Sequence, residues 1–235
     1  MLALAFGLLL IPPSLAYAGG GGASLARPVA AQTAGAATAP PTLPQEIPLF
    51  PLPDVVLFPG VSRPLLIFEP RYREMVADAL KGDHVSGMVL LRPGIEKDYE
   101  GRPPTYEIGC AGQIEDYQQL PDGRYLILLR GQTRFRVVSE DQRKAYRLAR
   151  VEALPEPLKD EERGALSTLR ERLAKLLYTV LPLGVDPPDP GLDDPEFVNV
   201  TAQNLSMPEA DRQELLERDG VLARARALVA RLEPK

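Results

Sequence analysis

Between residues 47 and 68, prolines and large apolar side chains follow one another too closely for a helix. Each proline fixes its own φ, lacks an N–H group and pushes the preceding residue towards an extended conformation. The apolar runs at residues 55–58 and 65–68 have the length and the β-branched content of short buried strands. Pro59-Gly60 supplies a turn between them. The region therefore predicts the entry to a compact β domain.

The composition is that of a soluble globular protein, with 45% hydrophobic and 25% charged residues in a chain of 235. This length allows one or two domains with a proper core. A net charge of −5 argues against a dominant nucleic-acid-binding surface, which is normally basic. Cys110 is the single cysteine and His84 the single histidine, which excludes an internal disulfide and argues against a zinc site or other metal cofactor.

Residues 1–18 have the features of an export signal, because an apolar stretch over residues 2–11 is followed by the small-x-small cleavage pattern Ala16-Tyr17-Ala18. The stretch is too short for a membrane span, so none is expected after cleavage. No Lys or Arg precedes it, and a misplaced start codon, with a cytoplasmic protein, is the alternative. Residues 19–44 are rich in Gly, Ala and Pro and predict a flexible linker.

Further along, strands with one inserted helix are followed only by helices, which indicates an α+β fold. A helix is expected over residues 69–81, where apolar side chains recur at helical spacing. Pro121-Asp122-Gly123 is a strong hairpin turn. Strands are expected over residues 85–91, 106–120, 125–138 and 146–154.

Pro155 and Pro157 close the β unit, and helical periodicity follows them. Helices are expected over residues 159–181, 196–205 and 221–232, the last capped by Asp219. Ser206-Met207-Pro208-Glu209 reads as a capping box that opens another helix. We therefore expect a β domain over residues 45–157 and a helical bundle over residues 158–235.

Motifs for catalysis or metal binding give no positive support for an enzyme. The chain contains neither a P-loop nor a Gly-x-Ser-x-Gly elbow. His84 follows Asp83, but adjacent residues rarely face one another productively, so a surface loop position is expected. Cys110 lies mid-strand in apolar surroundings and predicts a buried, inert thiol. An acidic, proline-rich loop is expected over residues 182–195. The spacing of its aspartates does not match a calcium-binding EF-hand; they are Asp186, Asp189, Asp193 and Asp194.

A local basic set lies on the expected strand 125–138, where Arg130, Arg134 and Arg136 share one face. Such a surface patch could contact the phosphates of a nucleic acid. A solvated sheet face is the more common cause of this pattern.

Three blocks of sequence resemble the N-terminal substrate-binding domain of Lon proteases. They are residues 47–60 with 64–68, residues 106–114, and residues 120–136. The resemblance covers roughly residues 45–232 and implies a PUA-like pseudo-β-barrel with one inserted helix, followed by a C-terminal helical bundle. Since the chain carries no Walker motif and nothing resembling the Ser-Lys proteolytic site, the likeness implies a stand-alone, non-catalytic domain without the ATPase and protease modules.

The resemblance also implies recognition of unfolded or extended polypeptide. An apolar groove or an open sheet edge would serve this purpose, and Leu57 and Phe58 are the candidate contacts, with burial in the core as the simpler interpretation of both. Two alternatives stay open. PUA-like domains include RNA readers, and related domains act as adaptors that dock one partner protein, such as a protease. If the protein is exported, its clients would be envelope proteins.

Overall fold

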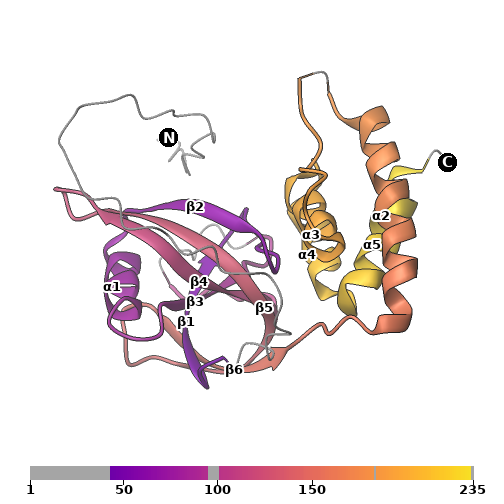
Figure 1. Ribbon diagram of the computed structural model, residues 1–235. Helices are drawn as coiled ribbons and strands as arrows, with labels where there is room; N and C mark the ends of the chain where they lie inside the picture. Colours follow the sequence, from indigo (N-terminus) through magenta and orange to yellow (C-terminus); the bar gives the residue numbers. More distant parts are fainter. Residues whose placement is uncertain (1–42, 95–100, 183, 234–235) are drawn as a thin grey trace, which may run out of the picture.

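The computed structural model describes residues 43–94, 101–182 and 184–233. The export signal expected over residues 1–18 lies outside the described residues, as does the expected linker apart from Leu43 and Pro44. The described part contains a mixed sheet of six strands and five helices, with one helix inserted among the strands and four after them (Figure 1). The predicted α+β class is confirmed.

The sheet curls round so that its last strand meets an interior one. Its order is β2-β5-β4-β3-β1-β6, and β6 pairs with β5 as well as with β1. β1 and β3 are parallel, whereas the other pairs are antiparallel. β2 is left at an edge. The strands are β1 (Glu46–Leu52), β2 (Ser62–Ile67), β3 (Val85–Leu90), β4 (Ile108–Gln119), β5 (Tyr125–Asp141) and β6 (Arg147–Leu154).

β5 is the longest strand and organises the sheet. Its first half pairs with β2, its second half pairs with β6, and β4 lies along both halves. The turn at Pro121-Asp122-Gly123 joins β4 to β5 as predicted, and Gly123 has the positive φ of +82° that such a turn favours.

The start of the β unit differs from the prediction. The first strand is β1, and residues 55–58 form a loop with every side chain buried. The loop can be buried because distant side chains satisfy its backbone: Gln203 donates to the carbonyl oxygen of Val56 at 2.6 Å, and Asn199 donates to that of Pro59 at 2.9 Å. The turn at Pro59-Gly60 forms as expected, with Gly60 at a φ of +79°.

The helices follow the predicted order, with small shifts at their ends. They are α1 (Pro70–Ala79), α2 (Asp160–Val180), α3 (Asp194–Asn204), α4 (Glu209–Glu217) and α5 (Gly220–Leu232). The predicted capping box at residues 206–209 is wrong, because Pro208 precedes α4 and no side chain caps it. Asp219 does precede α5, although its side chain makes no capping bond. Instead Asp193 caps α3, accepting a hydrogen bond from the N–H of Glu196 at 2.8 Å.

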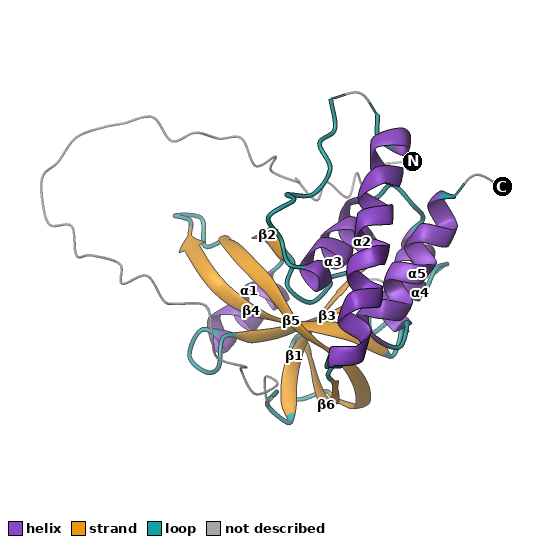
Figure 2. Cartoon of the chain, turned by 45° about the vertical axis from the view of Figure 1, so that its right-hand side comes forward, coloured by secondary structure: helices purple, strands orange, loops and turns teal. Residues whose placement is uncertain are grey.

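Sheet and helices share one apolar core. The larger cluster of buried side chains runs from β2, β5 and α1 through residues 55–58 to α2, α3 and α5. A smaller cluster is formed by side chains from β1, β3, β4, β5 and β6; its members are Ile47, Leu49, Val85, Val89, Ala111, Phe135 and Ala149. Helices α2 to α5 stand together beside the sheet, and the hairpin end of β4 and β5 extends away from them (Figure 2). Within the described ranges, none of the helices has the length and apolar character needed to cross a bilayer.

Candidate functional site

A buried ion network joins the helices to the sheet. Arg224 on α5 has no exposed surface, and its guanidinium donates to both carboxylate oxygens of Glu156, at 2.6 and 3.2 Å. It also donates to the side-chain oxygen of Asn199 at 2.6 Å and to the carbonyl oxygen of Leu215 at 3.0 Å. The guanidinium carbon lies 5.3 Å from the ring centroid of Phe58. One cation thus contacts the β–α connection, two helices and the buried loop.

Arg134 on β5 completes this network from the sheet. Its guanidinium pairs with Glu156, so that a single carboxylate lies between two buried cations. The same side chain donates to the carbonyl oxygens of Leu216 at 3.1 Å and Arg218 at 2.8 Å, which end α4. Because each group is desolvated, removal of one charged member would leave a buried charge without compensation.

The two predicted contact residues lie inside this junction. Leu57 and Phe58 are 1% and 0% exposed, so neither side chain faces solvent. Both lie in the core, as the simpler interpretation of the sequence predicted. Their contact with a polypeptide stays a prediction.

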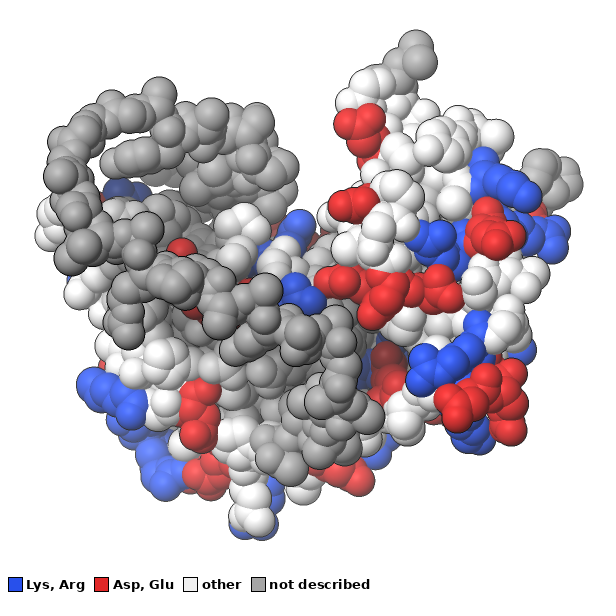
Figure 3. Space-filling view, viewed as in Figure 1, with Lys and Arg blue, Asp and Glu red and all other residues white. Residues whose placement is uncertain are grey.

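The predicted basic patch requires one correction. Arg130 and Arg136 lie at the surface, but Arg134 is 5% exposed and belongs to no surface patch. The reason is that the end of α4 and the β6–α2 connection contact the middle of the strand, where two carbonyl groups and Glu156 bind its guanidinium. Arg130 and Arg136 are themselves paired with Glu196 at 3.0 Å and Glu152 at 3.4 Å. On the face seen in Figure 3, acidic and basic side chains are similarly interspersed.

A partly exposed apolar strip lies on the opposite half of β5, next to β2. Cross-strand pairing sets Pro64 opposite Leu128 and Leu66 opposite Leu126. The intervening residues of both strands point into the core, so these four side chains and that of Phe68 share the other face. None of the five packs in either apolar cluster, and Phe68 is 47% exposed. We call this set the outer strip: Pro64, Leu66, Phe68, Leu126 and Leu128.

The far edge of β2 has no strand beside it among the described residues. The carbonyl oxygen of Val61 accepts from the N–H of Gly131 at 2.8 Å, which fixes which backbone groups face β5. By the alternation of an antiparallel pair, the backbone groups of Ser62, Pro64 and Leu66 face the free edge. Since Pro64 lacks an N–H, the edge offers two donors and three acceptors.

A pocket of about 450 Å³ continues the outer strip towards the helices. Arg130 lies opposite Ser62 in the strand register, one step beyond the Pro64–Leu128 pair, and lines this pocket with Gln132. Glu196 and Asn199 of α3 form the facing wall. The strand register therefore places the pocket one cross-strand pair beyond the outer strip.

Comparison with known proteins identifies the family. Residues 46–233 match the model of the ATP-dependent protease La (LON) substrate-binding domain. The chain belongs to this family.

Relatives and solved structures agree with the Lon assignment. The chain is 29% identical to Lon protease 2 of Myxococcus xanthus, over 85% of its own length and 25% of that protein. It is 32% identical to the Lon protease of Desulfovibrio desulfuricans, over 81% and 22%. The Lon N-terminal domain protein from Xanthomonas campestris superposes with a TM-score of 0.55 at 28% identity, covering 79% of this chain and 97% of that one. The chain thus spans about a quarter of the curated Lon proteases that it matches.

The outer strip of this Lon domain was missed by the sequence analysis, although a signal for it exists. Residues 126–129 are apolar at every position, whereas a strand with one solvated face alternates. In the structure Ile127 and Leu129 are buried in the core, whereas Leu126 and Leu128 are half-buried and lie outside both apolar clusters. Their partners on β2 could not be identified without the strand register.

The other chemistry-bearing residues lie apart from the strip. His84 is half-buried in the α1–β3 connection and has a φ of +58°. Cys110 is fully buried, and burial raises the pKa of its thiol, which keeps it protonated. In the acidic loop, Asp193 caps α3 and Asp194 pairs with Arg170 at 3.3 Å. Among the residues that the structure describes, no three His, Cys, Asp or Glu side chains gather as a metal ion would require.

An ionised carboxylate ties α1 to the segment before β6 and predicts a pH dependence. Asp78 accepts hydrogen bonds from Lys144 at 2.9 Å, Lys81 at 3.0 Å and Tyr146 at 3.0 Å. These bonds, the one from Lys144 foremost, lower the pKa of Asp78 from 3.8 to about 2. Because the folded pKa is the lower one, the stabilisation is complete above about pH 4 and is lost as the pH falls towards 2.

We expect Asp78→Asn to cost about 1 kcal/mol of unfolding free energy at pH 7, after allowance for solvent screening. The difference from wild type should shrink to near zero at pH 2. Urea unfolding at pH 7, 4 and 2 measures it, with Asp83→Asn in the neighbouring exposed loop as the control. A deficit of equal size at all three pH values would contradict the role given to the Asp78 charge.

Proposed function

We propose that this Lon-type domain binds unfolded or extended polypeptide segments along the outer strip and the free edge of β2. The strip carries the proposal, because it sets five apolar side chains beside a strand edge that no other described strand pairs with. Apolar contacts favour any exposed hydrophobic segment, and backbone hydrogen bonds at an edge do not depend on the guest sequence. Together they suit a ligand defined by being unfolded.

The neighbouring pocket supports this proposal with a different chemistry. Beyond the strip, a bound chain would reach Arg130 and Glu196, which form an ion pair 3.0 Å long at the pocket wall. Such a mixed-charge rim can exchange partners with polar side chains of a guest at little cost, because surface ion pairs contribute little. The apolar side chains of a bound polypeptide would thus anchor it at the strip, and the pocket would accept its polar side chains.

The division of the chain forms part of the proposal. We assign residues 45–157 to a PUA-like pseudo-barrel and residues 158–235 to a helical bundle. The closing pair β5–β6 and the prolines at 155 and 157 support this division. The role assigned is non-catalytic, with polypeptides as partners and no cofactor, and a protease is the natural recipient of what is bound. The paired state of Arg130 and Arg136 gives no support to nucleic-acid binding.

A double substitution on the strip tests the function. Leu66→Ser combined with Leu126→Ser removes one apolar cross-strand pair whose side chains lie outside both core clusters. We expect affinity for a permanently unfolded, reduced and carboxymethylated protein to fall roughly 30-fold, about 2 kcal/mol, as at a binding hot spot. Fluorescence anisotropy of the labelled polypeptide measures the change, and the native form of the same polypeptide should not bind.

The matched control is Tyr178→Ser, because this aromatic side chain is 75% exposed and lies on α2, outside the strip. It should leave affinity unchanged. If the control weakens binding as much as the double variant, the strip is not the contact surface. If wild type binds the native and unfolded forms equally, the function is wrong. Steeply salt-dependent binding of RNA by wild type would favour the nucleic-acid alternative.

A further inference from the structure

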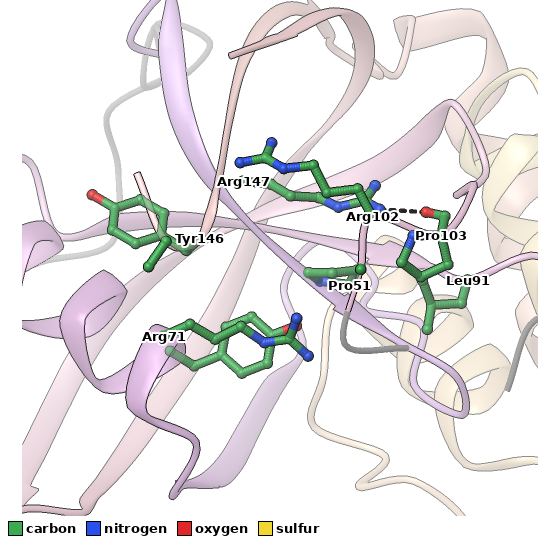
Figure 4. Close-up of a pocket in the computed structure, with 10 residues that line it drawn as sticks. Pro51, Arg71, Leu91, Arg102, Pro103, Tyr146 and Arg147 are labelled. Atoms are coloured by element: carbon green, nitrogen blue, oxygen red, sulfur yellow. Dashed lines mark hydrogen bonds between the residues drawn. The ribbon is translucent and has the colours of Figure 1, made fainter. Parts of the chain in front are cut away.

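A second pocket, of about 260 Å³, lies between α1, residues 101–103 and the start of β6. Figure 4 shows three arginine side chains reaching it from these three segments: Arg71, Arg102 and Arg147. A gathering of like charges is unfavourable unless an anion compensates it. The surroundings of each guanidinium therefore decide what this pocket can bind.

Two of the three cations have carboxylate partners. Arg71 pairs with Glu69 at 2.9 Å. Arg147 donates to Glu140 at 3.2 Å and also to the carbonyl oxygen of Pro103, and its side chain is only 7% exposed. Burial lowers the pKa of Arg147, and the positive charges of Arg102 and Arg71 lower it further, against the opposing effect of Glu140. An anion in the pocket would stabilise the charged form of Arg147 and so offset the effects of burial and of the neighbouring positive charges.

Arg102 is held differently. Its guanidinium donates to the carbonyl oxygens of Asp141 at 2.9 Å and Lys144 at 3.2 Å. These neutral acceptors orient the planar group without neutralising it. Among the described residues, no carboxylate thus contacts the guanidinium of Arg102.

The walls of the pocket suit an amino-acid residue. Pro51, Leu91 and Pro103 supply apolar surface, and Tyr146 an aromatic ring. The volume is below that of typical drug-sized ligand pockets and matches one residue of a polypeptide. A guanidinium presents a planar fork that matches a carboxylate in two parallel hydrogen bonds.

We infer that this pocket binds a carboxylate-bearing residue of a polypeptide, either the C-terminal residue or an Asp or Glu, with Arg102 as the group that contacts the carboxylate. One guanidinium without a carboxylate partner among the described residues matches the charge of one carboxylate. This inference extends the proposed function, since the ligand is again a polypeptide. The site itself is separate: β6 leads from Arg147 here to Glu156 beside the first pocket, roughly 25 Å of extended strand.

Short peptides without apolar side chains test the inference independently of the outer strip. The probes are acetyl-Gly-Ser-Gly-Ser-Gly with a free C-terminus, the same peptide as its C-terminal amide, and an amide with Asp in place of the last Ser. We expect the free acid or the Asp peptide to bind at least tenfold more tightly than the plain amide, measured by calorimetry and by NMR chemical shifts. The whole chain carries a net charge of −5, so its overall charge would favour the amide. Equal binding of all three overturns the inference.

Variants then locate the contact. Arg102→Gln should lower the affinity for the acid that binds at least tenfold. Arg102→Lys keeps the charge but loses the planar fork, so its affinity should lie between those of wild type and Arg102→Gln. The control Arg124→Gln changes an exposed hairpin arginine paired with Asp122 at 2.7 Å and should have no effect. Thermal unfolding checks each fold, and the acid–amide comparison on wild type decides the matter if Arg102→Gln is unstable. Undiminished binding by a folded Arg102→Gln overturns the assignment.

Two further binding measurements separate failure of this pocket from failure of the outer strip. Leu66→Ser with Leu126→Ser should leave binding of the short acids intact, so failure of the outer strip and failure of this pocket are distinguishable. Inorganic phosphate should compete only weakly with the acid. If phosphate binds and neither carboxylate peptide does, the pocket is a site for free anions and the inference is wrong.

Discussion

Glu156→Gln should destabilise the protein by about 3–5 kcal/mol, because it leaves two buried guanidiniums without their carboxylate. The side chains of Arg224 and Arg134 are 0% and 6% exposed, so water cannot replace the lost charge. Glutamine keeps the shape of the side chain but carries no charge, and its NH2 group is a donor where one of the two accepting oxygens of Glu156 stood. We expect a large shift in the midpoint of urea unfolding with little change in slope.

Glu152→Gln is the matched control for this prediction. Glu152 also pairs with an arginine of β5, but its side chain is 60% exposed and its partner Arg136 is 47% exposed. An exposed pair contributes little, so we expect a change within about 0.5 kcal/mol. Equal effects of the two substitutions would mean that burial does not set the importance of the Glu156 network.

Gly131→Ala should cost about 3 kcal/mol, because no side chain fits between β5 and the buried loop. A Cβ atom at residue 131 would lie 2.1 Å from the carbonyl oxygen of Phe58 and 2.9 Å from its carbonyl carbon. Relief requires movement of the loop backbone, which Asn199, Gln203 and Arg224 hold in place. Urea unfolding measures the loss, and increased binding of a hydrophobic dye should report the displaced loop.

The contrasting control is Gly164→Ala in α2. A Cβ atom there meets nothing within 4 Å, and alanine favours a helix by about 1 kcal/mol relative to glycine. We therefore expect this variant to be more stable than wild type. If Gly131→Ala is tolerated as well as Gly164→Ala, the loop does not pack against β5 as closely as described.

The features that sequence predicted correctly are those set by neighbouring residues. The β4–β5 turn and the extent of α1 follow from local geometry and spacing, which tertiary contacts did not alter. Residues 55–58 show the limit. Their composition suits a strand, but side chains more than 100 positions later satisfy their backbone and allow a loop instead.

The candidate site shows the same limit of prediction from local sequence. Arg134 and Arg130 lie on one strand and look alike in sequence, yet only Arg134 is beneath helices. The outer strip depends on the pairing of Leu66 with Leu126, which no local pattern specifies. Burial and strand register are properties of the assembled chain, and for this reason the contact residues proposed from structure differ from those proposed from sequence.

The position of Pro64 has a consequence for the protein at high concentration. A hydrophobic strand edge that can accept a guest can also accept a second copy of the protein, and such edges nucleate aggregates. Because Pro64 sits between Ser62 and Leu66 on that edge and lacks an N–H, two copies meeting there would lose the central hydrogen bond. The proline thus limits self-association at the surface that we propose for polypeptide binding.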